Sequence, residues 1–302
     1  MPELPEVETV VRDLRPCLAG RRLTTVKQSS QHSLRTRWHP AWNAEVSGQR
    51  IARVERRGKW ILVGLESEKT LVFHLGMTGQ LTVVPAASPI ADHTHLIFAF
   101  DDGEQELRFR DIRRFGSVTL FPTRPALEDF FIRSGLGPEP FDLPAKYWSD
   151  CLRATKRCLK AVLLDQGVAA GVGNIYADES LFQARLHPSR PACALDAAEA
   201  DRLRRAVATV LRRAIERRGS SIRDYVGGSG LRGEYQNEFR VYGRTGEPCP
   251  RCGTAIACLR LAGRSSHFCP SCQKSVTTNH TNSTNNKDKK NRKNPKRRPR
   301  LP

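Results

Sequence analysis

The sequence predicts an α+β protein: an N-terminal half rich in strands, a helical C-terminal half, and then a small zinc-binding segment. Short strand-like runs separated by turn residues fill residues 23–121, and helical spacing of apolar residues replaces them beyond residue 140. Two Cys-x-x-Cys motifs follow between residues 249 and 272. We expect a strand-rich domain at 1–135, a linker at 136–145, a helical domain at 146–238, a finger at 239–273 and a tail at 274–302.

The composition indicates a polyanionic partner. The chain has 302 residues and a formal net charge of +19. Ten Lys/Arg and one Asp in residues 274–302 supply +9 of this charge, which leaves +10 for the first 273 residues. The part of the chain expected to fold is therefore basic in its own right, and nucleic acid is the expected partner.

Other features of the composition bear on location. No run of eighteen apolar residues, secretory h-region or lipidation motif is present, so we expect no membrane contact. An odd total of nine cysteines with one tight cluster favours reduced thiols plus metal over disulfides. We therefore expect a protein of the cytosol or nucleus, or of the bacterial cytoplasm in association with the nucleoid.

The strand-rich half begins with a short helix, expected over residues 2–16. Its apolar face carries Val7, Val10, Val11 and Leu14. The expected strands that follow include 60–65, 70–75, 95–100 and 106–110. Turn residues at 101–103 predict a hairpin between the last two runs. Many short strands of this kind predict a β-sandwich or a barrel.

The helical half follows a Pro/Gly-rich segment at 136–140, which is typical of an interdomain linker. Asp196 and Glu199 form a capping box and predict the start of a long helix that stops at Gly219. The apolar face of this helix carries Leu203, Val207, Val210, Leu211 and Ala214. Glycine-rich residues 227–233 predict a mobile loop, and the Asn/Lys/Arg/Pro tail predicts disorder.

The cysteine cluster predicts one structural Zn²⁺. Cys249 and Cys252 form one pair, Cys269 and Cys272 form the other, and sixteen residues separate the pairs. Each pair offers two thiolates from one tight turn, and four thiolates complete a tetrahedral shell with no open position. Cys258, between the pairs, is expected to be a packing residue, and chance pairs or disulfides are the alternative. The segment should form a β-hairpin that displays basic side chains.

The N-terminus has a feature that suits covalent chemistry. It reads Met1-Pro2-Glu3-Leu4-Pro5-Glu6. Removal of Met1 would give Pro2 a free secondary amine, which is more nucleophilic at pH 7 than a lysine ammonium because its pKa lies closer to neutrality. Glu3 beside it can relay protons. The alternative is a frayed terminus whose acidic residues only begin a helix.

Together, the Pro-Glu-Leu-Pro-Glu-Val-Glu-Thr start and the cysteine pairs resemble the formamidopyrimidine-DNA glycosylases, bacterial enzymes that excise oxidised purines. Further motifs in the family's order are Arg56-Arg57-Gly58-Lys59, His74-Leu75-Gly76-Met77-Thr78-Gly79, Arg113-Arg114-Phe115-Gly116, Gly171-Val172-Gly173-Asn174-Ile175-Tyr176 and Val241-Tyr242-Gly243-Arg244. The resemblance covers residues 2–273. It implies a β-sandwich with flanking helices, a helix–two-turn–helix element within residues 171–218 and a zinc finger with four cysteine ligands. It also implies a monomer that acts on double-stranded DNA containing oxidised bases or abasic sites.

The resemblance also implies roles for individual residues. Pro2 corresponds to the nucleophile at the deoxyribose C1′, and Glu3 to its acid/base partner. Lys59 corresponds to a lysine that contacts phosphate and serves β-elimination, and Arg264 to a finger arginine linked to δ-elimination. The expected DNA-binding residues are Glu6, Met77, His95, Arg113, Phe115, Lys156, Lys160, Asn174 and Tyr242. Met77, Arg113 and Phe115 are expected to form a wedge that fills the gap left by the extruded nucleotide.

The sequence departs from the family pattern in three places. Ile112 stands where the family usually has proline, the Gly-Ser-Gly at 228–230 is hard to align with the lesion-capping loop, and the basic tail extends beyond the usual terminus. Endonuclease VIII-type enzymes for oxidised pyrimidines are the nearest alternative, and Leu4 and Phe115 favour the purine enzyme. A non-enzymatic damaged-DNA-binding relative would lack Pro2, Glu3 or Lys59, and all three are present.

Overall fold

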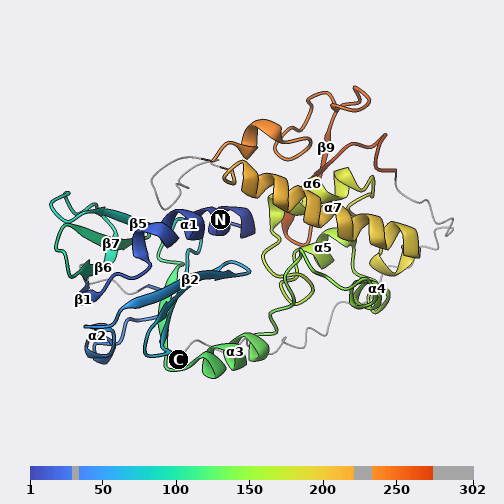
Figure 1. The fold of residues 1–302 in the computed structure, drawn as a ribbon. Coiled ribbons are helices and arrows are strands. Elements are labelled where there is room, and N and C mark those ends of the chain that lie inside the picture. Colours follow the sequence, from blue (N-terminus) through green and yellow to red (C-terminus); the bar gives the residue numbers. More distant parts are fainter. Residues whose placement is uncertain (29–33, 221–232, 275–302) are drawn as a thin grey trace, which may run out of the picture.

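The computed structural model describes residues 1–28, 34–220 and 233–274. Most of the loop expected at 227–233 and nearly all of the expected tail lie outside these residues. Figure 1 shows the strand-rich half and the helical half side by side, with α1 (Leu4–Leu18) where the two halves meet. Among the described residues, no helix has the length and apolar content to cross a membrane.

The N-terminal half is a β-sandwich of two antiparallel four-stranded sheets, so the expected sandwich is confirmed and the barrel is not formed. One sheet has the order β1-β6-β7-β5, which is Leu23–Gln28, Thr94–Phe100, Gln105–Arg110 and Gln80–Pro85. The other has the order β2-β3-β4-β8, which is Ile51–Arg57, Trp60–Leu65, Thr70–His74 and Ser117–Phe121. The four predicted strands form within one residue of their expected bounds, and β6 pairs with β7 as the hairpin predicts.

Helices flank the sandwich. α1 begins and ends two residues later than predicted, and its predicted apolar face is buried in the sandwich core. The shorter helices are α2 (Ala41–Val46) and α3 (Arg124–Arg133). The α3 helix packs on a satellite cluster with Leu62, Val72 and Phe121.

The C-terminal half is helical and has its own core. Its helices are α4 (Ala145–Arg153), α5 (Leu159–Leu163), α6 (Asn174–Gln183) and α7 (Ala197–Glu216), with single 3₁₀ turns η1 (Ala192–Ala194) and η2 (Tyr235–Glu238). The predicted capping box of Asp196 and Glu199 is present at the start of α7. After α7 the chain turns at Gly219, whose φ of +73° suits a residue without a Cβ.

The finger is a hairpin of β9 (Ala257–Leu261) and β10 (Arg264–Phe268), as predicted. Phe182 of α6 packs with Val241, Ile256 and two of the cysteines in a small separate cluster. The finger therefore rests on α6.

The segment expected to be an interdomain linker is bound to the sandwich. Glu139 accepts hydrogen bonds from the backbone N–H of Gly58 at 2.7 Å and from the guanidinium groups of Arg56 and Arg57 at 2.7 and 3.1 Å. Arg57 also donates to the carbonyl of Gly137. These bonds tie the linker to the turn between β2 and β3, which carries Lys59.

Candidate active site

Three segments that are distant in sequence bring charged groups around the N-terminus. Four charged residues act electrostatically on the terminal amine of Met1: Glu3, Glu6, Lys59 and Arg264. Burial, the largest effect, lowers the pKa of this amine. The two carboxylates raise its pKa, and the two cations lower it. Pro2 is buried directly behind this amine. The start of α1, the β2–β3 turn and the finger hairpin thus meet at one place.

Glu3 joins the N-terminus to the start of α6. Its carboxylate accepts the N–H groups of Ile175 at 3.0 Å and Tyr176 at 3.4 Å, where unpaired amides and the helix dipole favour an anion. A Cβ on Gly173 would lie 2.3 Å from the Glu3 carboxyl carbon, so glycine is needed there. The Gly-x-Gly-Asn motif therefore makes room for a carboxylate.

Glu6 is enclosed beside Glu3. It accepts hydrogen bonds from the Tyr176 hydroxyl, the Ser220 N–H at 2.8 Å and the Glu3 N–H at 2.8 Å. Burial, followed by repulsion from Glu3, raises the pKa of Glu6 to about 7, and the hydrogen bonds act in the opposite direction. This carboxyl can hold or release a proton near neutral pH.

Lys59 supplies a buried amine to the same cluster. Its side chain is 7% exposed, and Nζ donates to the Val172 carbonyl at 3.1 Å. Burial lowers the pKa of Lys59, the carboxylates of Glu3 and Glu6 raise it, and Arg264 lowers it. Its ammonium is therefore easier to deprotonate than a solvated lysine.

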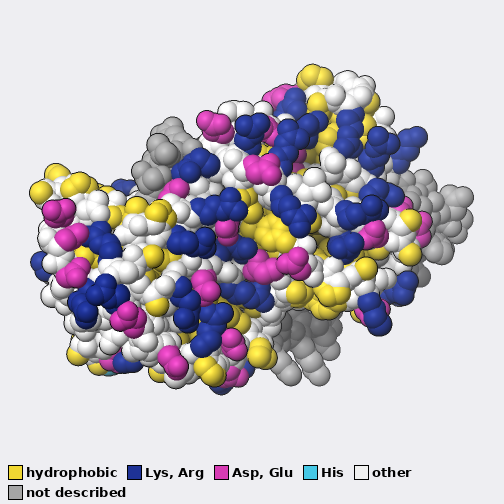
Figure 2. Space-filling model, viewed as in Figure 1, with side chains coloured by type: hydrophobic (Ala, Val, Ile, Leu, Met, Phe, Trp, Pro, Cys, Tyr) yellow, Lys and Arg dark blue, Asp and Glu magenta, His cyan; other side chains and the backbone are white. Residues whose placement is uncertain are grey.

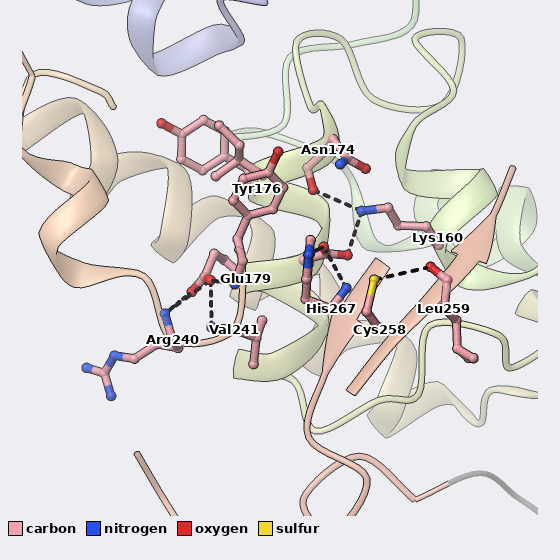
Figure 3. Close-up of polar contacts among 12 residues, drawn as sticks. Lys160, Asn174, Tyr176, Glu179, Arg240, Val241, Cys258, Leu259 and His267 are labelled. Atoms are coloured by element: carbon pink, nitrogen blue, oxygen red, sulfur yellow. Dashed lines mark hydrogen bonds and ion pairs between the residues drawn. The ribbon is translucent and has the colours of Figure 1, made fainter. Parts of the chain in front are cut away.

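Lys160, an expected DNA-binding residue, is buried in an ion pair. The side chain is 0% exposed, and its ammonium donates to the Asn174 carbonyl at 2.9 Å and to Asp178 at 2.5 Å (Figure 3). The other oxygen of Asp178 accepts the His267 backbone N–H at 2.9 Å and lies 3.0 Å from its ring Nδ1. In this structure Lys160 and Asp178 therefore join α5, α6 and β10.

Glu179, which motif reasoning missed, holds the segment that carries Tyr242. Its carboxylate accepts the backbone N–H groups of Arg240, Val241 and Tyr242 at 2.9–3.1 Å, and Figure 3 shows part of this arrangement. Burial raises the pKa of Glu179. The sequence signal for this role is a pair of consecutive acids, Asp178 and Glu179, between the apolar residues Ala177 and Leu181 of a short helix.

The other expected contact residues lie at two places. Met77, Arg113 and Phe115 lie on neighbouring loops of the sandwich, where Arg113 stacks over the Phe115 ring at 4.7 Å. Phe115 is 47% exposed, which excludes a core role. His95, at a register shift between β6 and β7, is nearly buried.

The remaining group lies on the helical side. Asn174, Arg260 and Arg264 line an open cavity of about 560 Å³ beside the finger hairpin. Burial raises the pKa of Tyr242, and a side-chain hydrogen bond with Asn174 lowers it. Lys156 is exposed after α4. Figure 2 shows Lys and Arg side chains gathered over α7 and the finger, which is a surface suited to a polyanion.

The four predicted cysteines form the metal site. The Sγ atoms of Cys249, Cys252, Cys269 and Cys272 all lie within 4.8 Å of one another, with pairs at 3.5 and 3.9 Å. A tetrahedron with Zn–S bonds of about 2.3 Å requires sulfur atoms roughly 3.8 Å apart. The site thus fits one structural Zn²⁺. Cys258 lies outside this group and is exposed on β9, so the prediction that it packs inside was wrong.

Comparison with known protein families defines the class as a three-part DNA glycosylase. Residues 1–118 match the formamidopyrimidine-DNA glycosylase N-terminal domain, and residues 136–226 match the H2TH domain of the same enzymes. Residues 246–274 match a zinc finger found in FPG and IleRS. The chain belongs to the formamidopyrimidine-DNA glycosylase family.

Individual relatives agree over their whole length. The formamidopyrimidine-DNA glycosylase of Desulforamulus reducens is 44% identical over 278 residues, which span 91% of this chain and 100% of the relative. That of Thermomicrobium roseum is 45% identical over 291 residues, covering 90% and 99%.

Solved structures of the Lactococcus lactis enzyme are also similar. A complex of a point mutant of that enzyme with DNA containing Fapy-dG superposes with a TM-score of 0.85 at 34% identity and covers 91% of this chain and 100% of the other. A complex with DNA containing an abasic site has a TM-score of 0.84 at 34% identity, covering 90% and 100%.

Proposed function

We propose that this chain is a bifunctional DNA glycosylase and abasic-site lyase that excises oxidised purines from double-stranded DNA. The observation that carries the proposal is the meeting of the N-terminus with Glu3, Lys59 and Arg264. A nucleophilic amine, a carboxylate and two cations are the groups that such a reaction requires. Relatives solved with Fapy-dG and abasic-site DNA support the substrate class.

The first step breaks the bond between base and sugar. After loss of Met1, the Pro2 nitrogen attacks the deoxyribose C1′ as the N-glycosidic bond breaks, and the base leaves with a proton. Glu3 moves protons at the sugar as the ring opens to an iminium ion on Pro2. Arg264 and Lys59 bind the flanking phosphates, which their positive charges suit.

The later steps cleave the strand. Loss of a proton from C2′ drives β-elimination of the 3′ phosphate, and Lys59, with its lowered pKa, serves this step. A second elimination releases the 5′ phosphate, and Arg264 serves it. The wedge of Met77, Arg113 and Phe115 fills the gap in the duplex, which offsets part of the cost of extruding a nucleotide.

Borohydride trapping tests the nucleophile. Wild-type protein incubated with duplexes containing 8-oxoguanine or formamidopyrimidine should form a covalent protein–DNA adduct on reduction. Pro2→Gly and protein that retains Met1 should trap far less. Equal trapping by either form would exclude Pro2 as the nucleophile, and faster cutting of thymine glycol duplexes would assign the chain to the pyrimidine-specific class.

A further inference from the structure

A buried carboxylate outside the proposed chemistry, Asp111, sits beneath the wedge. It follows the end of β7, is 0% exposed, and accepts hydrogen bonds from two loops. Oδ1 accepts the Thr78 hydroxyl at 2.6 Å, and Oδ2 accepts the Gly116 N–H at 2.7 Å. Thr78 follows Met77, and Gly116 follows Phe115, so this carboxylate connects the two loops that carry the wedge.

The backbone of Asp111 extends the connection. Its carbonyl accepts His95 Nε2 at 2.9 Å and the Arg114 N–H at 3.3 Å, and its own N–H donates to the His93 carbonyl at 3.0 Å. The bond to Arg114 closes a tight turn over residues 111–114. The Arg113 N–H donates to Thr78 Oγ1 at 3.0 Å and lies 3.3 Å from Asp111 Oδ1.

The wedge loops also touch through their backbones. A Cβ on Gly76 would lie 2.5 Å from the carbonyl carbon of Phe115, and Gly76 has a φ of +61°. The wedge side chains Arg113 and Phe115 are exposed and contact each other at 4.7 Å. Their placement therefore depends on the groups that fix the loop backbone from inside.

A carboxylate suits this position better than a neutral side chain. Donors from Thr78, Arg113 and Gly116 point at its two oxygens, and an ionised carboxylate only accepts. An asparagine would turn its NH₂ group toward one of these donors. The buried charge is thus stabilised by hydrogen bonds that also define the loop shape.

Ile112 leaves the turn dependent on this carboxylate. It occupies the second position of the 111–114 turn and is 39% exposed. Within the described residues, its N–H donates no hydrogen bond to a backbone carbonyl. Proline is favoured at this turn position because its ring fixes φ. With isoleucine there, no ring fixes φ, and the turn depends more on the hydrogen bonds that Asp111 accepts.

We propose that Asp111 is a positioning residue that holds Met77, Arg113 and Phe115 in the arrangement that enters DNA. This rests on the proposed function, because the wedge acts only on duplex substrates. Loss of Asp111 should impair extrusion of an intact damaged nucleotide more than cleavage at an abasic site, where extrusion costs less.

Single-turnover rates on two duplexes test this role. For Asp111→Asn we expect excision of 8-oxoguanine to slow by roughly tenfold or more, since hydrogen bonds to a charged group are lost. Cleavage at a preformed abasic site should stay within about twofold of the wild-type rate, because extrusion costs less there. Thr78→Val should give the same pattern as Asp111→Asn, with slower excision and little change at the abasic site, but the slowing should be smaller. Ile112→Pro should be as fast as wild type and should restore part of the excision rate to Asp111→Asn.

Controls separate positioning from folding and from failure of the proposed function. Zinc content and thermal unfolding show whether each variant folds, and Phe115→Ala gives the selectivity expected when the wedge itself is removed. Should Asp111→Asn fail to fold, Thr78→Val carries the test. Equal slowing on both duplexes by a folded variant overturns the inference. A wild-type protein that cuts neither duplex overturns the proposed function instead.

Discussion

Glu6 is a carboxyl group that the fold prepares to titrate near neutral pH. Burial is the main cause, and with repulsion from Glu3 it raises the pKa from 4.5 to about 7. A carboxyl whose pKa is higher in the folded than in the unfolded chain stabilises the fold below its unfolded pKa. That stabilisation is lost as the pH rises through the folded value.

We therefore expect the free energy of unfolding to fall as the pH rises from about 5 to about 8, because the folded protein must release a proton that the unfolded chain has already lost. Urea denaturation at a series of pH values measures this. Glu6→Gln cannot ionise and should show a shallower decline. An identical slope in the two proteins would mean that Glu6 does not titrate in this range.

The sequence pointed to some of these residues and could not point to others. The motifs carried Glu3 and Lys59, which the structure brings to the same buried cluster. They gave no sign that Glu139 holds the Lys59 turn or that Lys160 is buried against Asp178. Both facts depend on partners distant in the chain, and an exposed charge and a buried, paired one look alike in sequence.

At the scale of elements, α6 serves as the support for the finger. Asp178 fixes β10, and Glu179 fixes the segment at 240–242. We predict that Asp178→Asn lowers the free energy of unfolding by about 3 kcal/mol, because the buried Lys160 ammonium loses its partner. Adding Lys160→Met should recover much of that loss. Chemical denaturation of the two single variants and the double variant measures the coupling free energy between Asp178 and Lys160. If the losses in the free energy of unfolding simply add in the double variant, the ion-pair role is excluded.

The finger should depend on its metal as a unit. Cys252→Ser removes one of four thiolates, so we expect loss of stoichiometric zinc and of DNA binding, since a segment this small needs its metal to fold. The sandwich has a separate core and should keep its thermal transition. Metal analysis, calorimetry and a binding assay check the three outcomes. Active wild-type protein without zinc would contradict the prediction.

Periodicity predicted elements well where one face is buried. α1 and the β6–β7 hairpin followed from apolar spacing and turn residues. The position of Cys258 was misjudged because β9 has exposed residues at three consecutive positions, 258–260, and lies open on the finger surface. An isolated cysteine gives no sign of which side of a two-stranded hairpin it faces.

At the scale of the whole molecule, carboxylates connect segments that are distant in the chain. Glu3 reaches the start of α6, Glu6 reaches Ser220, and Glu139 reaches Gly58. These contacts join residues up to 214 positions apart, so no local pattern predicts them. The candidate active site depends on this long-range arrangement, which brings the N-terminus to the helical half.

The C-terminal tail should add affinity for DNA without specificity. The structure indicates where to truncate: Gln273 is buried, accepts the Cys269 N–H and donates to the Leu186 carbonyl, so it must stay. Removing residues 275–302 deletes nine Lys/Arg and one Asp, a net charge of +8. These residues include no aromatic side chain of the Phe, Tyr or Trp type, so they can neutralise phosphates but offer no stacking surface.

Each phosphate that the tail neutralises contributes roughly 0.9 to the slope of log K against log salt on B-form DNA. The truncated protein should therefore excise lesions at low salt as wild type does, bind undamaged duplex more weakly, and show a slope flatter by several units. Binding titrations across a salt series measure the slope, and a tail with its Lys and Arg changed to Gln separates charge from length. An unchanged slope would mean that the tail does not engage DNA. Loss of excision at low salt would mean that it contributes to the reaction itself.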